Sequence, residues 1–278
     1  RWDPPAGIPA NTIAAITQTP DGYLWIATLK GLVRFDGLTF QKEDLSLPET
    51  AIPLTLHVDK QGHLWVGTNQ GLTRYDSQSG RAKTFTEEDG ITGDGIRRIE
   101  EDMHGNLWVS FTASHVNRFS EKQFTAYDPS HGLDGNKINA ILEDQKGNLL
   151  FGSREKGIFI YKDGKFSPYP IPGLEGAQVI AMHEDREAAL WIGTNNGLFR
   201  KTGKRVDTYT TADGLSDNYI TDIKEDSERN LWVGSQKGLN RINKKQDGSI
   251  TFESLLEEFT IICLFEDREK SLWAGTYK

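Results

Sequence analysis

The chain has 278 residues, of which 36% are hydrophobic and 26% charged, and its mean hydropathy of −0.54 is typical of a globular chain rather than a membrane-embedded or disordered one. No purely apolar run, residues 261–265 included, is longer than five residues, far short of the roughly 20 residues of a membrane-spanning helix. A net charge of −8 without a basic cluster argues against a nucleic-acid surface. The single cysteine, Cys263, excludes an internal disulfide and a cysteine-based zinc site.

One pattern, Leu-Trp followed by a short apolar stretch and often Gly-Thr, recurs along the whole chain. Its central position returns every 40 to 43 residues and is occupied by Trp25, Trp65, Trp108, Leu150, Trp191, Trp232 and Trp273. A fixed period of this size is the signature of a repeat architecture. Seven copies of one unit therefore account for the chain.

Each repeat predicts four short strands. In the sixth repeat the apolar runs cover residues 219–224, 230–235, 239–242 and 250–254, and turn residues separate them. The second strand carries Leu, Trp and Val in succession, so both faces of its sheet must be apolar. A four-stranded sheet covered on both faces by neighbours of its own kind is a propeller blade. The sequence therefore predicts an all-β fold, a β-propeller of seven four-stranded antiparallel blades.

The seventh repeat stops after its second strand. Residues 272–276 match the repeated Trp strand, and no residues remain for the third and fourth strands. Arg1, Trp2 and Asp3 stand in the place of a fourth strand, and we expect them to pair with the last blade. We interpret residues 1–278 as a single propeller domain with an incomplete last blade, and as a fragment of a longer protein.

The repeated phrases resemble a known family. Residues 21–28 read Asp-Gly-Tyr-Leu-Trp-Ile-Ala-Thr, residues 31–37 read Gly-Leu-Val-Arg-Phe-Asp-Gly, and residues 214–218 read Gly-Leu-Ser-Asp-Asn. Together they resemble the two-component regulator propeller repeats of bacterial signalling receptors. The likeness extends over all seven repeats, although the fourth has Leu150 in place of tryptophan and the third lacks the Gly-Thr and Gly-Leu phrases.

The resemblance implies a sensory domain in the periplasm, outside the cytoplasmic membrane. In receptors of this kind, a membrane span and a histidine kinase or diguanylate cyclase module follow the propellers, and the ligands of relatives are often carbohydrates. From the resemblance we expect a small polar ligand or an oligosaccharide, no nucleic acid, no direct membrane contact in this segment, and a homodimer in the full receptor.

Two groups of residues invite a metal-site interpretation. The turns that begin at Asp59, Asp102 and Asp144 read Asp-x-x-Gly, but each offers one carboxylate where calcium needs six to eight oxygens. We interpret them as tight turns in which Asp accepts backbone N–H bonds and Gly supplies a positive φ. His57 and His183 share one position of the first strand, and a ring could bring them to a common channel, but we favour separate imidazoles. We predict no metal and no cofactor.

The sequence gives little support to catalysis, because no serine, cysteine or lysine nucleophile stands out beside a base. We predict that the propeller is not an enzyme. Two alternatives stay open: a carbohydrate-active propeller lyase or hydrolase, and a ligand-free dimerisation scaffold. We interpret the repeated tryptophans as core. Tyr219 is a better candidate for a stacking platform, because it replaces small or polar residues of other repeats.

Strand direction alternates within a blade, so the connections from the fourth strand to the next blade and from the second to the third strand emerge at one end. There the turn residues vary, whereas the opposite end repeats a plain turn. Convergent amides and charges can hydrogen-bond a polar ligand. The predicted ligand-binding residues are Asn11, Lys30, Asn69, Asp94, Asn136, Arg154, Lys156, Asn195, Asn218, Tyr219 and Lys237.

Overall fold

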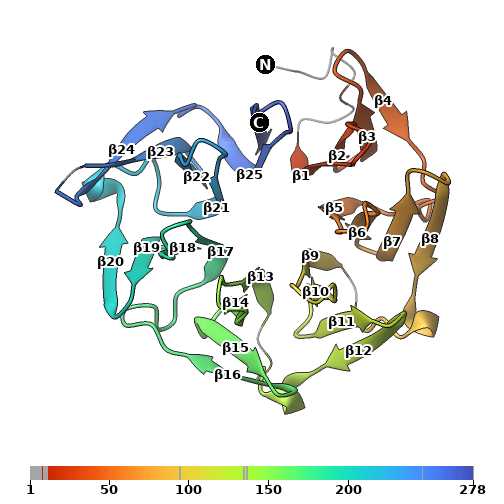
Figure 1. The fold of residues 1–278 in the computed structure, drawn as a ribbon, viewed down its shortest axis with the longest axis horizontal. Coiled ribbons are helices and arrows are strands. Elements are labelled where there is room, and N and C mark those ends of the chain that lie inside the picture. Colours follow the sequence, from red (N-terminus) through yellow and green to blue (C-terminus); the bar gives the residue numbers. More distant parts are fainter. Residues whose placement is uncertain are drawn as a thin grey trace. The chain divides into compact units, whose positions relative to one another are not determined.

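The computed structural model describes residues 8, 12–93, 95–133, 135, 137–245 and 247–277. The chain divides into two compact units, Arg1–Ile138 (unit 1) and Asn139–Lys278 (unit 2). Each is built from antiparallel sheets whose strands follow one another along the chain, as Figure 1 shows. We call each sheet a blade, number the blades in chain order, and letter the strands within a blade A to D.

Unit 1 contains blades 1 to 3, each with four strands. Blade 1 consists of β1 (Ile13–Gln18), β2 (Leu24–Thr28), β3 (Gly31–Phe35) and β4 (Phe40–Glu43). Blade 2 consists of β5 (Pro53–Val58), β6 (Leu64–Thr68), β7 (Gly71–Asp76) and β8 (Arg81–Phe85). Blade 3 consists of β9 (Ile96–Glu101), β10 (Leu107–Phe111), β11 (Val116–Ser120) and β12 (Gln123–Tyr127).

Unit 2 contains blades 4 to 7, of which the last has two strands among the described residues. Blade 4 consists of β13 (Ile138–Glu143), β14 (Leu149–Ser153), β15 (Ile158–Lys162) and β16 (Lys165–Tyr169). Blade 5 consists of β17 (Val179–Glu184), β18 (Leu190–Thr194), β19 (Gly197–Thr202) and β20 (Arg205–Tyr209). Blade 6 consists of β21 (Ile220–Glu225), β22 (Leu231–Ser235), β23 (Gly238–Lys244) and β24 (Ile250–Leu255), and blade 7 of β25 (Thr260–Glu266) and β26 (Leu272–Tyr277).

This strand order confirms the predicted all-β architecture of seven repeats with an incomplete last blade. The predicted pairing of Arg1, Trp2 and Asp3 lies outside the described residues. Among the described residues, three short 3-10 helices, which the repeat pattern did not predict, lie in connections from strand D to strand A: Glu87–Asp89, Pro129–His131 and Thr211–Asp213. The A strands of successive blades contact one another in blades 1 to 3 and in blades 5 to 7, and within each unit the D strands fan apart (Figure 1).

Strand B forms the core of each blade. All five of its residues are buried in blades 1 to 5, and Trp25, Trp65, Trp108 and Trp191 are at most 1% exposed, which confirms the core interpretation. Trp232 departs from it, because this side chain is only half-buried. It packs beside Ile261 and Leu264 of blade 7, where the described sheet has two strands rather than four.

The glycine of the repeated Trp-x-Gly phrase lets neighbouring blades approach closely. A Cβ at Gly67 in strand B of blade 2 would lie 2.6 Å from Cγ2 of Ile96 in strand A of blade 3. Gly193 in blade 5 meets Ile220 of blade 6 in the same way, at 2.5 Å. Real Cβ atoms do not tolerate such distances, so the glycine is required by packing between blades.

Candidate ligand-binding face

In blades 2 to 7 the A–B turn begins with an aspartate, whereas blade 1 has Thr19 at this position. Asp59 accepts hydrogen bonds from the backbone N–H groups of Gln61 (3.0 Å) and His63 (2.8 Å), and also from the indole Nε1–H of Trp65 (2.8 Å). The same indole bond joins Asp102 to Trp108, Asp185 to Trp191, Asp226 to Trp232 and Asp267 to Trp273. The turn interpretation is thereby confirmed, and the aspartates also anchor the core tryptophans, which the sequence analysis missed.

The electrostatics of these aspartates follow from the same contacts. Burial by itself raises the pKa of Asp102, but hydrogen bonds from Asn106 and Trp108 outweigh it and lower the pKa below its usual value. The pKa values of Asp185 and Asp226 are also lowered, because hydrogen bonds to these carboxylates, including those from Trp191 and Trp232, again outweigh burial. These carboxylates are therefore ionised structural acceptors.

The two histidines of the shared strand A position lie at contacts between neighbouring blades. Nε2 of His57 is 3.9 Å from Oε2 of Glu101 in the next blade, and Nε2 of His183 is 3.7 Å from Oε2 of Glu225. Burial lowers the pKa of His57 to about 4 and lowers that of His183 as well, so both are neutral at pH 7. Among the described residues no three histidine, cysteine, aspartate or glutamate side chains gather as a metal site would require.

Two of the predicted ligand-binding asparagines have structural roles. Asn195, in the B–C turn of blade 5, accepts a hydrogen bond at Oδ1 from the backbone N–H of Gln178, at 3.0 Å. In blade 2, Oδ1 of Asn69 accepts a hydrogen bond from the backbone N–H of Ile52, at 2.6 Å. Each asparagine thus ties its turn to the residue that precedes strand A of its own blade, and its carbonyl oxygen is occupied.

Three predicted residues come together between blades 5 and 6. Asn218 accepts the backbone N–H of Thr211 at Oδ1 (2.8 Å), which holds the 3-10 turn before strand A of blade 6. The backbone carbonyl of the adjacent Tyr219 accepts the N–H of Gln236 (3.2 Å), so the B–C turn of blade 6 lies beside it. This turn carries Lys237, and we call Asn218, Tyr219 and Lys237 the blade 6 polar group.

Asp217 connects this group and was missed by the sequence analysis. Its Oδ1 accepts the backbone N–H of Tyr219 at 2.7 Å, and its Oδ2 lies 3.8 Å from Nζ of Lys237. The Lys237 side chain is 74% exposed, whereas that of Asp217 is 19% exposed. Asp217 belongs to the Gly-Leu-Ser-Asp-Asn phrase, in which only the neighbouring Asn218 is among the predicted ligand-binding residues.

The other predicted residues are dispersed. Lys30 is exposed in the B–C turn of blade 1, and Arg154 and Lys156 are exposed in that of blade 4. Their backbones are held by ordinary turn bonds, such as that from the N–H of Lys156 to Oγ of Ser153 (2.9 Å). The remaining predictions, Asn11, Asp94 and Asn136, lie outside the described residues.

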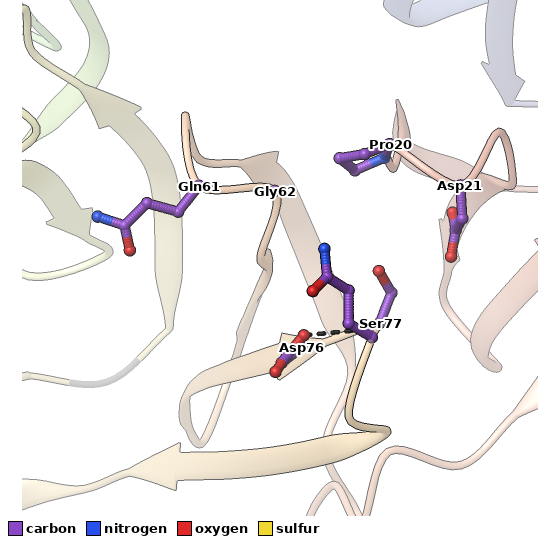
Figure 2. Close-up of a pocket in the computed structure, with 7 residues that line it drawn as sticks. Pro20, Asp21, Gln61, Gly62, Asp76 and Ser77 are labelled. Atoms are coloured by element: carbon purple, nitrogen blue, oxygen red, sulfur yellow. Dashed lines mark hydrogen bonds between the residues drawn. The ribbon is translucent and has the colours of Figure 1, made fainter.

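A shallow hollow of about 250 Å³ lies in unit 1 at the opposite end of the strands, among A–B and C–D turns. Figure 2 shows Asp21 and Pro20 on one side of it and Asp76 and Ser77 on the other. Asp76 is held by hydrogen bonds from the Oγ–H of Ser79 (2.6 Å) and the backbone N–H of Gln78 (2.9 Å), and its pKa is lowered by them. None of the predicted ligand-binding residues lines this hollow.

Solved structures share the fold over nearly the whole chain. One is the "extracellular domain of the putative hybrid two component system BT3049 from B. thetaiotaomicron", at a TM-score of 0.82 and 23% identity, over 100% of this chain and 40% of that one. Virginiamycin B lyase from Staphylococcus aureus matches at 0.77 and 15% identity, over 96% and 92% of the two chains. The "extracellular domain of the putative one component system BT4673 from B. thetaiotaomicron" matches at 0.58 and 18%, over 97% and 50%.

These likenesses identify the fold as a β-propeller, and the chain spans less than half the length of the BT3049 domain. No curated protein matches the chain significantly. In the part of the chain that the structure describes, the helices lack the length and apolar character needed to cross a bilayer.

The family comparison agrees with the repeated phrases. A sequence profile of the two component regulator propeller matches residues 7–30, 46–70, 132–155 and 214–237. The matched segments fall in repeats 1, 2, 4 and 6 and include the Leu-Trp strands of three of them. These four segments of the chain are therefore two component regulator propeller repeats.

Proposed function

We propose that this chain is the ligand-sensing propeller of a bacterial signal-transduction receptor, that it acts in the periplasm, and that it binds its ligand without converting it. The four segments that match the two component regulator propeller support the sensor role. Two propellers with the same fold are described as extracellular domains of one and two component systems, which supports the location. Virginiamycin B lyase, which has the same fold, shares 15% identity with the chain and carries no argument for catalysis here.

The observation that carries the proposal is the blade 6 polar group. It combines an aromatic ring, a mostly exposed ammonium and an amide on one side of unit 2. Stacking on the Tyr219 ring suits the apolar face of a sugar, and Lys237 suits a hydroxyl or an acidic group. Asn218 already accepts a bond at Oδ1, so it offers the Nδ2 donors. The proposed ligand is a small polar molecule such as an oligosaccharide.

The test is binding to a glycan array, followed by calorimetry with the glycans that bind. Tyr219→Ala combined with Lys237→Ala should weaken binding at least about tenfold without changing the melting temperature, because neither side chain belongs to the buried core. Asn218 is kept, since its loss would loosen the Thr211 turn.

The matched control is Ser77→Ala with Gln78→Ala in the hollow at the other end of the strands. These changes should leave glycan affinity unchanged. Affinity that survives the Tyr219 and Lys237 changes but falls with the control would contradict the proposed site, because it would show that the ligand binds among the A–B and C–D turns. Turnover of a bound glycan would contradict the non-enzymatic role.

A further inference from the structure

The first residue of the B–C turn is tied to the residue that precedes strand A. In blades 2, 5 and 6 the backbone N–H of the turn residue donates to the backbone carbonyl of that residue. The pairs are Asn69 with Ile52 (3.3 Å), Asn195 with Gln178 (3.2 Å) and Gln236 with Tyr219 (3.2 Å). In blades 2 and 5 the asparagine side chain completes the tie, because its Oδ1 accepts the backbone N–H of the same partner.

In blade 6 a different residue completes the tie. Oδ1 of Asp217 accepts the backbone N–H of Tyr219 at 2.7 Å. At the position of Asp217, blades 2 and 5 have Thr50 and Gly176. The N–H that an asparagine would bind is therefore occupied, and no hydrogen bond joins the side chain of Gln236 to another of the described residues. Asp217 thus takes over the role of the asparagine and releases a primary amide.

The released amide extends from a fixed backbone. The carbonyl of Gln236 accepts the Oγ1–H of Thr260, the first residue of β25, at 2.8 Å, while its side chain is exposed beside Lys237 in the sequence. The neighbouring connection is anchored by the fully buried Asn240, whose Oδ1 accepts the backbone N–H of Ser216 at 2.9 Å. Side chains on a backbone held in this way are preorganised for binding.

We propose that Gln236 is a further ligand-binding residue of the blade 6 polar group, and that the ligand it binds is uncharged and rich in hydroxyl groups. This inference rests on the proposed function. A primary amide offers a donor and an acceptor in one plane, which suits two neighbouring hydroxyl groups, one accepting and the other donating. Asp217 is the positioning residue that frees this amide.

The charges around Gln236 indicate an uncharged ligand. Nζ of Lys237 lies 3.8 Å from Oδ2 of Asp217. A Cβ at Gly238 would lie 3.1 Å from Cα of Glu257, so the connection of residues 255–259 runs beside the same turn. The connections of residues 210–219 and 255–259 contain no basic residue and carry four carboxylates: Asp213, Asp217, Glu257 and Glu258. An anionic ligand would meet like charge here, so Lys237 should bind a hydroxyl group.

The first test is calorimetry with the uncharged glycans that bind on the array. Gln236→Ala should weaken their binding at least about fivefold and leave the melting temperature unchanged, because the side chain holds no other described residue. The matched control is Asn69→Ala, at the same repeat position in blade 2. It should lower the melting temperature, because it removes the acceptor of the Ile52 N–H, and leave glycan affinity unchanged.

The second test exchanges the two arrangements. Asp217→Ala alone should lower the melting temperature, since it removes the acceptor of the Tyr219 N–H. Adding Gln236→Asn should restore the melting temperature, because the shorter amide can accept this N–H as Asn195 does in blade 5. The double variant should still bind the glycans at least about fivefold more weakly, because its amide is no longer free.

The outcomes separate this inference from the proposed function. Unchanged affinity of Gln236→Ala for glycans whose binding the Tyr219 and Lys237 changes weaken would overturn this inference alone. Failure of Gln236→Asn to restore the melting temperature would overturn the positioning role of Asp217. Tighter binding of uronic-acid or sulfated glycans than of their uncharged counterparts would overturn the ligand class. If no glycan binds, or binding ignores the Tyr219 and Lys237 changes, the proposed function fails and this inference with it.

Discussion

The fourth residue of each A–B turn has the same left-handed backbone conformation, but the energetic cost of that conformation depends on the residue type. The fourth turn residue has a positive φ throughout, and it is glycine in blades 1 to 4, for example Gly147 at φ 78°. In the later blades it is Ala188 (φ 59°), Arg229 (φ 71°) or Lys270 (φ 65°). A residue with a Cβ pays a steric cost of about 1–2 kcal/mol in this region, so these three turns hold a conformation that their side chains disfavour.

Ala188→Gly should therefore raise the free energy of unfolding by about 0.5–1 kcal/mol, once the greater freedom of glycine in the unfolded chain is subtracted. Ala188 is exposed, so little apolar contact is lost. Urea denaturation measures the change. Gly147→Ala is the mirror control and should destabilise by about 1 kcal/mol. Changes of the same sign in both variants would contradict the argument.

His57 predicts a pH dependence. Its pKa is about 4 in the folded chain because burial disfavours the charged form, against 6.5 when unfolded. Below about pH 6.5 the unfolded chain therefore binds a proton that the folded chain does not, and stability falls as the pH drops toward 4. The groups that face the ring are Glu101 of the next blade and the nearby Asp59 and Lys60.

Between pH 7 and pH 5 the His57→Gln variant should lose roughly 2 kcal/mol less free energy of unfolding than the unchanged chain. Urea denaturation at both pH values measures the difference. His104→Gln is the control, because His104 is exposed in the A–B turn of blade 3. An equal pH slope in the chain with and without His57 would show that this imidazole is not the source.

At the scale of elements, the last residue of strand A joins neighbouring blades. Oε2 of Glu184 in blade 5 accepts the backbone N–H of Gln145 in the A–B turn of blade 4 at 2.5 Å, and the Gln145 amide returns a bond to the carbonyl of Asp185 at 2.7 Å. The same glutamate bond joins Glu101 to Lys60, Glu225 to Arg186 and Glu266 to Ser227. The recurring Glu-Asp pair thus has divided roles, since Glu holds the neighbouring turn and Asp holds its own.

Glu184→Ala should destabilise the chain by about 2 kcal/mol, because it removes a charge-assisted bond and leaves a backbone donor without its acceptor. Glu184→Gln keeps an acceptor oxygen and should recover about half of the loss. Glu253→Ala, on an exposed site of β24, should change stability by less than about 0.5 kcal/mol. Thermal or urea unfolding of the three variants decides between a specific bond and a general effect of charge.

At the scale of the whole molecule, stability should be unevenly distributed. Blades 1 to 6 each pair four strands, whereas the described part of blade 7 pairs two, and its strand B is half-buried where those of blades 1 to 5 are fully buried. Regions with fewer buried contacts open more readily. Amides that pair β25 with β26 should therefore exchange at least about tenfold faster than those that pair β17 with β18. Equal protection by hydrogen-exchange mass spectrometry would contradict this expectation.

The repeat architecture was determined by the sequence alone. The period near 41 residues, the four apolar runs and the consecutive Leu-Trp-Val of strand B are local patterns, and local pattern decides strand positions and two-sided burial. The same reasoning predicted the turn role of Asp59, because an Asp followed by Gly at that spacing closes a tight turn without help from elsewhere.

Only the tertiary structure decided what the polar turn residues do. Asn69 and Asn195 look like ligand donors, but each carbonyl oxygen accepts a bond from a backbone group 17 positions earlier. Asp217 joins Tyr219 to Lys237 through contacts that cross two connections. Trp232 shares its repeat position with fully buried tryptophans, yet its exposure depends on the neighbouring blade. Burial and hydrogen-bond partners belong to the packed sheets, so no window of sequence around one residue contains them.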